Sequence, residues 1–182
     1  MLLMRMLAAA SGYPGCAHTA VVSECSDVLR LADDIGAVPI RQTAGSGLNN
    51  AVGQGVAVLR SVRPGPVLVV AADLPLVTTN DLRSIAPAGR KCSLVVFTDK
   101  HRTGTNALYL PAGIPFQFQF GPNSCAAHYR EGMAAVAATS VLFSARIAFD
   151  IDTPEDLLAW RRIEPSPPPN TARVAWRAKS VG

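Results

Sequence analysis

The chain has 182 residues, of which 49% are hydrophobic, and a formal net charge of +4 at pH 7. This length suits one domain with a substantial core, and no apolar run is long enough to span a membrane. From Arg161 onward, five basic side chains and one acidic side chain account for the whole net charge, so the body is neutral and no extended nucleic-acid groove is expected.

The N-terminal stretch, Met1–Ala10, is apolar but interrupted by Arg5, with no charged region before it. These features predict a helix over residues 2–10 rather than a signal peptide, so we expect a cytoplasmic protein. The cysteines and histidines lie apart, without the spacing of a zinc site, a redox motif or a catalytic triad. They are Cys16, Cys25, Cys92, Cys125, His18, His101 and His128.

A strand, a helix and a second strand are predicted in quick succession after a turn at residues 11–15. The strands are residues 19–23 and 37–41, and the helix between them, residues 26–34, ends before Gly36. This spacing is typical of parallel strands joined by crossover helices. We therefore predict an α/β fold with a doubly wound, mostly parallel sheet and helices on both faces, a three-layer α/β/α arrangement.

A glycine-bearing loop at residues 45–47 opens the next predicted helix, whose apolar residues keep helical spacing. They are Leu48, Ala51, Val52, Val56 and Leu59. Loop amides followed by a helix N-terminus can hold a phosphate or a polar ring, but this loop lacks the dinucleotide-binding pattern and the lysine of a phosphate loop. Taken alone, the stretch is explained more simply as a turn that leads into a packing helix.

The apolar run at residues 66–72 ends in Asp73, Pro75 and a turn. Such a run predicts a parallel strand buried on both faces, and strands of this kind place functional groups at their carboxyl ends. A carboxylate at the end of a buried strand is costly without a cation or a donor, so Asp73 is a candidate metal or ligand residue. Its alternative role is to cap the helix predicted at residues 78–85.

The region after the strand predicted at residues 92–98 is rich in polar side chains. The segment Phe116–Phe120 alternates phenylalanine with glutamine, which predicts a half-buried strand, with a strand or a loop as its partner. In the helix that follows, Ser124 and His128 are four residues apart and share a face. Serine, threonine, asparagine and histidine side chains in this region could hold a small anion. Alternatively, these residues could serve only as helix caps and turn residues.

A second acidic cluster lies at Ala148–Leu157. Asp150 and Asp152 alternate with apolar residues, so on an extended backbone both carboxylates point to one face. Thr153 is expected to cap a helix whose first turn, residues 154–156, has the proline and the acids typical of that position. These two alternating acids, together with Asp73, suit a hard divalent cation that also binds phosphate oxygens.

The folded domain is predicted to comprise residues 1–163. Residues 164–182 are proline-rich and then polar and basic, so they are expected to form a disordered tail. Nothing in the residues of this tail supports a partner-binding role.

Five motifs in the order found here resemble those of one family. They are Gly47–Asn49; Ala72–Pro75; Gly104–Leu108; Phe120–Ser124 with His128; and Asp150–Leu157. Together they resemble the phospholactate guanylyltransferase family of coenzyme F-420 biosynthesis, over roughly residues 1–160. The resemblance implies the MobA-like nucleotidyltransferase fold, a nucleotide-diphospho-sugar-transferase-like α/β architecture.

The resemblance implies transfer of GMP from GTP to a three-carbon phospho acid, with release of pyrophosphate. The acid is phosphoenolpyruvate, 2-phospho-L-lactate or 3-phospho-D-glycerate in different members. The residues implied are Asp73, Asp150 and Asp152 as catalytic residues that hold magnesium; Thr105, Asn106, Gly121, Ser124 and His128 for the acceptor; and Gly47, Leu48 and Asn49 for GTP. GTP and the phospho acid are the expected partners, neither nucleic acid nor a membrane is expected, and a homodimer is possible.

The chain differs from that family at its start. Family members begin with a strand and a basic loop that binds the triphosphate, whereas this chain begins at the helix that follows. Without that strand, its two neighbours would lack hydrogen-bond partners, which predicts poor folding or weak GTP binding. A start placed too late in the reading frame and a decayed copy both explain this difference.

Two other functions remain open from the sequence. One is a different nucleotidyltransferase of the same fold, acting on a molybdenum cofactor or a sugar phosphate; the short acceptor region and the lack of long insertions count against it. The other is a non-catalytic domain that binds an intact paralogue. The shortened start favours this domain, and the retention of all three acids disfavours it.

Overall fold

The computed structural model describes residues 2–13, 15–43, 45, 47–85, 93–135 and 138–163. The chain forms two compact units, Met1–Ile151 and Asp152–Gly182. The tail predicted at residues 164–182 lies outside the described residues.

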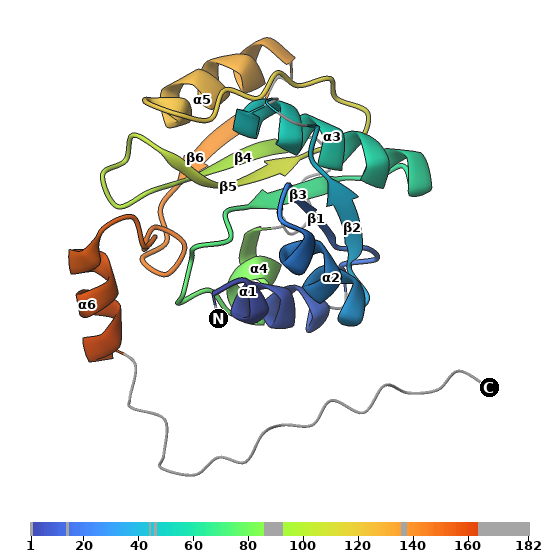
Figure 1. The fold of residues 1–182 in the computed structure, drawn as a ribbon. Helices are drawn as coiled ribbons and strands as arrows, with labels where there is room; N and C mark the ends of the chain where they lie inside the picture. The colour runs from blue at the N-terminus through green and yellow to red at the C-terminus, as the bar shows by residue number, and fades with distance from the viewer. Residues whose placement is uncertain are drawn as a thin grey trace. The chain divides into compact units, whose positions relative to one another are not determined.

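Helices and strands alternate along the first unit, except that β4 is followed directly by β5 (Figure 1). They are α1 (Leu2–Ser11), β1 (Ala20–Ser23), α2 (Ser26–Asp34), β2 (Val38–Arg41), α3 (Gly47–Val62), β3 (Val67–Val70), α4 (Thr79–Ile85), β4 (Ser93–Thr98), β5 (Thr105–Leu110), α5 (Ser124–Ala135) and β6 (Ala138–Leu142). The helices and strands predicted between residues 2 and 41 and between residues 78 and 98 are confirmed, and their ends differ by at most one residue.

The strands of the described residues form two sheets. β1 and β2 pair in parallel, with Ala20 opposite Val38, and α2 connects them. The second sheet has the order β3-β5-β4-β6, in which β4 and β6 are parallel and both neighbours of β5 are antiparallel to it. The loop at residues 99–104 joins β4 to β5, and so short a connection can join only antiparallel neighbours.

β3 differs from the parallel strand that the apolar run at residues 66–72 predicts. It is antiparallel to β5, pairing Val67 with Leu110 and Val70 with Ala107, and it lies at one end of the four-stranded order. Val67 is buried, whereas the other three residues of β3 are half-buried. The apolar pattern correctly predicted a strand, but its direction depends on β5, which returns between β3 and β4.

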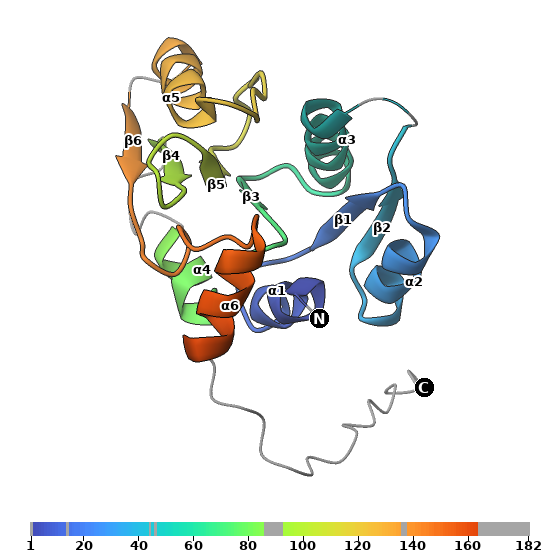
Figure 2. The ribbon, with the colours of Figure 1, turned by 60° about the vertical axis from the view of Figure 1, so that its left-hand side comes forward.

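Side chains that alternate along β4 and β5 build one core on each face of the four-stranded sheet, and helices cover both faces (Figure 1 and Figure 2). Leu94 and Val96 pack with residues of α3 and α5, whereas Val95 and Phe97 pack with residues of α1 and α4. A smaller core joins α1 to α2. The predicted α/β class, with helices on both sides of the sheet, is thus confirmed.

The prediction of a strand at Phe116–Phe120 is wrong, although burial does alternate along this segment. Its phenylalanines are half-buried and its glutamines exposed, but no strand of the described residues pairs with it. Two side chains replace the ladder: the His128 ring accepts the Gln119 N–H, and the Asn49 amide bonds both backbone groups of Phe120. Period-two burial therefore indicates an extended backbone without requiring a neighbouring strand.

The second unit contains α6 (Pro154–Ile163), which begins as the sequence predicts. Thr153 and Asp156 cap each other: the Thr153 N–H donates to the Asp156 carboxylate at 3.0 Å, and the Asp156 N–H donates to the Thr153 hydroxyl at 3.2 Å. This reciprocal arrangement satisfies two amide groups at the helix start. Across the described ranges, no helix combines the length and the apolar character that crossing a membrane requires.

Candidate functional site

Two of the three predicted acidic residues come together beyond the carboxyl end of β3. Asp73 lies in the turn after β3, and its carbonyl oxygen accepts the Ile151 N–H at 3.2 Å, which brings Asp150 beside this turn. Asp150 is buried and Asp73 is half-buried. Asp152, the third acid, is the first residue of the second unit and is exposed.

The helix after Asp73 is capped by other residues. At the start of α4, the Thr78 N–H donates to the Asp81 carboxylate at 2.9 Å, and the Asp81 N–H donates to the Thr78 hydroxyl at 3.3 Å. These two residues satisfy each other in the same way as the pair that caps α6. The capping role considered for Asp73 is therefore filled by Thr78, and the ligand role remains.

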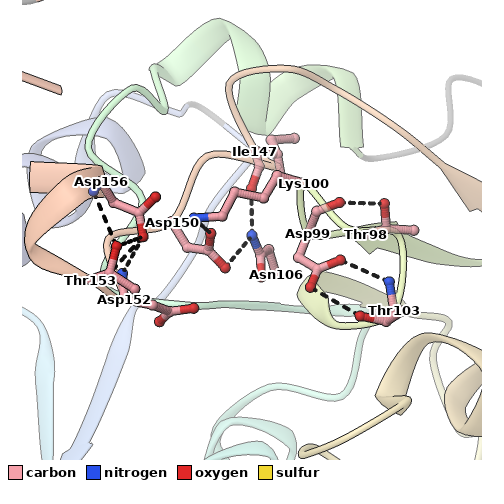
Figure 3. A network of polar contacts seen from close by, with 10 residues as sticks. All are labelled: Thr98, Asp99, Lys100, Thr103, Asn106, Ile147, Asp150, Asp152, Thr153 and Asp156. Atoms are coloured by element: carbon pink, nitrogen blue, oxygen red, sulfur yellow. Dashed lines mark hydrogen bonds and ion pairs between the residues drawn. The ribbon is translucent and has the colours of Figure 1, made fainter. Parts of the chain in front are cut away.

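The Asp150 carboxylate is held by one amide and one cation (Figure 3). The Asn106 amide donates to Ile147 O at 3.0 Å and reaches Asp150 Oδ2 at 3.4 Å. The Lys100 ammonium lies 3.4 Å from Asp150 Oδ1, an atom that is buried and accepts no hydrogen bond. Lys100 was not among the residues predicted from the sequence, because nothing local links the loop after β4 to an acid so far along the chain.

The chemistry of these residues fits a hard cation. Asp73 and Asp150 supply carboxylate oxygens, the ligand type that magnesium prefers, and Asp150 Oδ1 is a buried oxygen without a hydrogen bond. Among the described residues, however, no group of three or more acidic, histidine or cysteine side chains is arranged to hold a metal ion. Since Asp150 and Asp152 belong to different units, the three-acid magnesium site stays a prediction.

The first two residues of β5 connect the acidic residues to the predicted acceptor residues. Successive side chains of a strand point to opposite sides, and here Asn106 reaches Asp150 while the Thr105 hydroxyl lies 3.0 Å from His128 Nδ1. Both side chains are buried. Two predicted groups that are separate in the sequence therefore meet at the start of one strand.

His128 lies behind Thr105, and its side chain has no exposed surface. Its Nε2 accepts the Gln119 N–H at 2.9 Å, so the neutral ring carries its proton on Nδ1 and donates it to the Thr105 hydroxyl oxygen. Burial lowers the pKa of His128 from 6.5 to about 4, which keeps the ring neutral. The Thr105 hydroxyl, which accepts from the ring, keeps its own hydrogen for donation to another group.

Gly121 and Ser124 form the turn that starts α5. Gly121 has φ of +128°, a conformation that favours glycine, and its carbonyl oxygen accepts the Ser124 N–H at 3.1 Å. Ser124 is buried, and the next amide, that of Cys125, donates to Thr103 O at 3.0 Å. Hydrogen bonds thus join Thr105 to His128 and Gly121 to Ser124, and the Cys125 amide attaches the start of α5 to the 99–104 loop.

The residues predicted to bind GTP lie at the start of α3. Gly47 and Leu48 are exposed, and the Leu48 side chain keeps 61% of its surface. Asn49 instead holds the end of Phe116–Phe120, the segment that leads to the predicted acceptor residue Gly121: its amide nitrogen donates to Phe120 O at 3.2 Å, and its oxygen accepts the Phe120 N–H at 2.6 Å. Gly47 and Leu48 are therefore accessible to a ligand, while Asn49 connects α3 to the segment before the predicted acceptor residues.

Comparisons with known proteins extend over most of the chain. Residues 1–160 match the family described as "Guanylyl transferase CofC like". A phosphoenolpyruvate guanylyltransferase from Rubrobacter xylanophilus is 36% identical over 159 residues, which cover 86% of this chain and 76% of the relative. A second phosphoenolpyruvate guanylyltransferase, from Conexibacter woesei, is 32% identical over 74% of this chain and 61% of the relative.

A relative named for a different substrate is about as similar. The 3-phospho-D-glycerate guanylyltransferase of Phenylobacterium zucineum is 32% identical over 158 residues, which cover 85% of this chain and 72% of the relative. The resemblance drawn from the five motifs is confirmed by these matches, and with it the assignment to nucleotidyltransferases. On the strength of this coverage and identity, the chain belongs to the CofC-like guanylyl transferase family.

Proposed function

We propose that this chain transfers GMP from GTP to a three-carbon phospho acid and releases pyrophosphate. The candidate acids are phosphoenolpyruvate, 3-phospho-D-glycerate and 2-phospho-L-lactate. The relatives named for the first two acids support the substrate class. The structural observation that carries the proposal is the start of β5, where Thr105 and Asn106 join the acceptor residues to Asp150.

In the proposed reaction, a phosphate oxygen of the acid attacks the α-phosphorus of GTP. A new P–O bond forms there, and the bond from the α-phosphorus to the oxygen that bridges to the β-phosphate breaks, so pyrophosphate leaves with that oxygen. Such a displacement needs positioning and charge neutralisation and no protein nucleophile. Magnesium, held by Asp73, Asp150 and Asp152, would supply that neutralisation when bound.

The acceptor is positioned by groups around the start of β5 and α5. The Thr105 hydroxyl accepts its hydrogen bond from His128, so its own hydrogen can donate to an oxygen of the acid. Ser124 and Gly121 lie at the α5 start, whose first turn contains no acidic residue to repel an anion. The exposed Gly47 and Leu48 at the start of α3 would contact the guanine nucleotide.

The test is pyrophosphate release by the purified chain, given GTP, magnesium and each of the three acids in turn. We expect release with one or more acids, and we expect Asp152→Asn to abolish it while circular dichroism shows an intact fold, because one hard ligand charge is lost. The matched control is Asp34→Asn, which removes an exposed acid at the end of α2. A folded chain that releases no pyrophosphate with any acid would contradict the proposal.

A further inference from the structure

Lys100 lies in the loop between β4 and β5, at the point where the acidic and acceptor residues meet. Its ammonium is 3.4 Å from Asp150 Oδ1, and the side chains keep 30% and 11% of their exposure, respectively. The carboxylate side of this pair is largely buried, so solvent screens the pair less than it screens an ion pair on the surface. This lysine belongs to none of the residue groups that the family resemblance implied.

The other contacts of the Asp150 carboxylate are weak. Asn106 Nδ2 lies 3.4 Å from Oδ2, long for a hydrogen bond, and the same amide group donates to Ile147 O at 3.0 Å. Oδ1 is buried and accepts no hydrogen bond. The ammonium therefore neutralises a carboxylate whose oxygens are otherwise loosely held, which leaves them able to take another cation (Figure 3).

We propose that Lys100 is a positioning residue that neutralises Asp150 until a divalent cation takes the carboxylate, so that lysine and metal compete for one oxygen. A divalent ion bound to Asp150 would lie within a few ångströms of the ammonium, and the repulsion between the two cations would displace the lysine. The identity of the cation as magnesium rests on the proposed function. The displaced ammonium stays in the loop that leads into Thr105.

The competition predicts that removing the lysine charge strengthens metal binding. Magnesium affinity would be measured by titration calorimetry without nucleotide for the wild type, Lys100→Met and Lys100→Arg. The methionine variant should bind at least about tenfold more tightly, because the competing charge is gone, and the arginine variant should stay near the wild type. The double variant with Lys100→Met and Asp150→Asn should lose this increase in magnesium affinity.

The controls separate competition from general electrostatics and from stability. Arg102→Met removes a positive charge from the same loop, where Arg102 stacks over the Phe143 ring at 5.0 Å, and it should change magnesium affinity little. Since Lys100→Met leaves Asp150 buried without its cation, the variant could unfold, and Lys100→Gln then provides an uncharged donor in its place. Circular dichroism monitors the fold of each variant.

Two outcomes would overturn the inference: unchanged or weaker magnesium binding in the folded uncharged variants, and no magnesium binding by any of the proteins. A purely stabilising ion pair predicts lower stability without tighter metal binding. The inference and the proposed function fail separately, because calorimetry contains no GTP or acid. Tighter binding without any pyrophosphate release would contradict only the proposed function.

Discussion

His128 shows at the residue scale how burial sets a role that residue type leaves open. An exposed histidine near an anion could bind it as a cation, but this ring is fully buried, and Phe116 and Phe120 lie 5.6 and 4.7 Å from its centre. Its two nitrogens are occupied by Gln119 and Thr105. The ring therefore orients a hydroxyl and a backbone segment, and contributes no charge to ligand binding.

The lowered pKa of His128 predicts a pH-dependent stability. In the unfolded chain the ring is protonated below about pH 6.5, whereas in the folded protein it stays neutral down to about pH 4. The neutral His128 ring therefore makes its full contribution to the free energy of unfolding above pH 6.5, and this contribution is lost as the pH falls from 6.5 towards 4. Its slope is at most about 1.4 kcal/mol per pH unit.

Urea unfolding at pH 7, 6 and 5 checks this prediction in the wild type and in His128→Gln. Glutamine can still accept the Gln119 N–H but does not titrate in this range, so the variant should lose less stability on acidification. The difference between the two curves isolates the histidine from the carboxylates, which both proteins share. An equal dependence of stability on pH in the two proteins would mean that the ring takes up its proton in the folded protein over the same pH range as in the unfolded chain.

At the scale of elements, the segment Phe116–Phe120 is an extended chain held by side chains instead of a neighbouring strand. The Asn49 amide replaces two ladder hydrogen bonds at Phe120, and the His128 ring replaces one at Gln119. Phe116 and Phe118 pack on the core that α3 and α5 share. The segment thus connects the start of α3, where GTP is expected, to the turn at Gly121.

Asn49→Leu should destabilise the protein and weaken acceptor binding. The change removes both hydrogen bonds to Phe120 and leaves its backbone groups unsatisfied, which costs about 1–3 kcal/mol of unfolding free energy. Because Phe120 precedes Gly121, we expect the KM for the acid to rise more than the KM for GTP. Urea unfolding and steady-state kinetics measure the two effects.

The matched control is Asn80→Leu, which makes the same substitution at an exposed position of α4. It should leave stability and both KM values nearly unchanged. A loss confined to GTP affinity in Asn49→Leu would show that Asn49 contacts the nucleotide, as the family resemblance implies. It would contradict the expectation that Asn49 acts on acceptor binding by holding Phe120.

At the scale of the whole molecule, the predicted metal ligands are divided between two compact units. Asp73 and Asp150 belong to Met1–Ile151, and Asp152 begins Asp152–Gly182. If magnesium binds only the folded protein, its binding and the stability of the chain should be linked.

Thermal unfolding with GTP, with and without magnesium, tests this link. Magnesium and GTP at 100 times the dissociation constant should stabilise the wild type by about 2.7 kcal/mol, because the ligand binds only the folded state. Asp152→Asn should lose most of the magnesium-dependent part, whereas Asp34→Asn should keep it. Full stabilisation of Asp152→Asn would contradict the prediction that Asp152 is a metal ligand.

The sequence by itself determined the local structure and the family. Some features depend on residues only a few positions apart, so they can be predicted from the sequence. They are helix starts such as Thr153 with Asp156, the helices and strands from residue 2 to residue 41, and the apolar strand before Asp73. The five ordered motifs likewise identified the guanylyl transferase family, which the comparisons confirm.

Only the tertiary structure decided the contacts between distant residues. The antiparallel direction of β3 depends on where β5 returns, and the attachment of Phe120 to Asn49 spans 71 residues of chain. The burial of His128 and the Lys100–Asp150 pair also arise only when separate elements pack together. Local periodicity shows which side of an element is buried, but not what lies against it, because that depends on how all the elements pack around a common core.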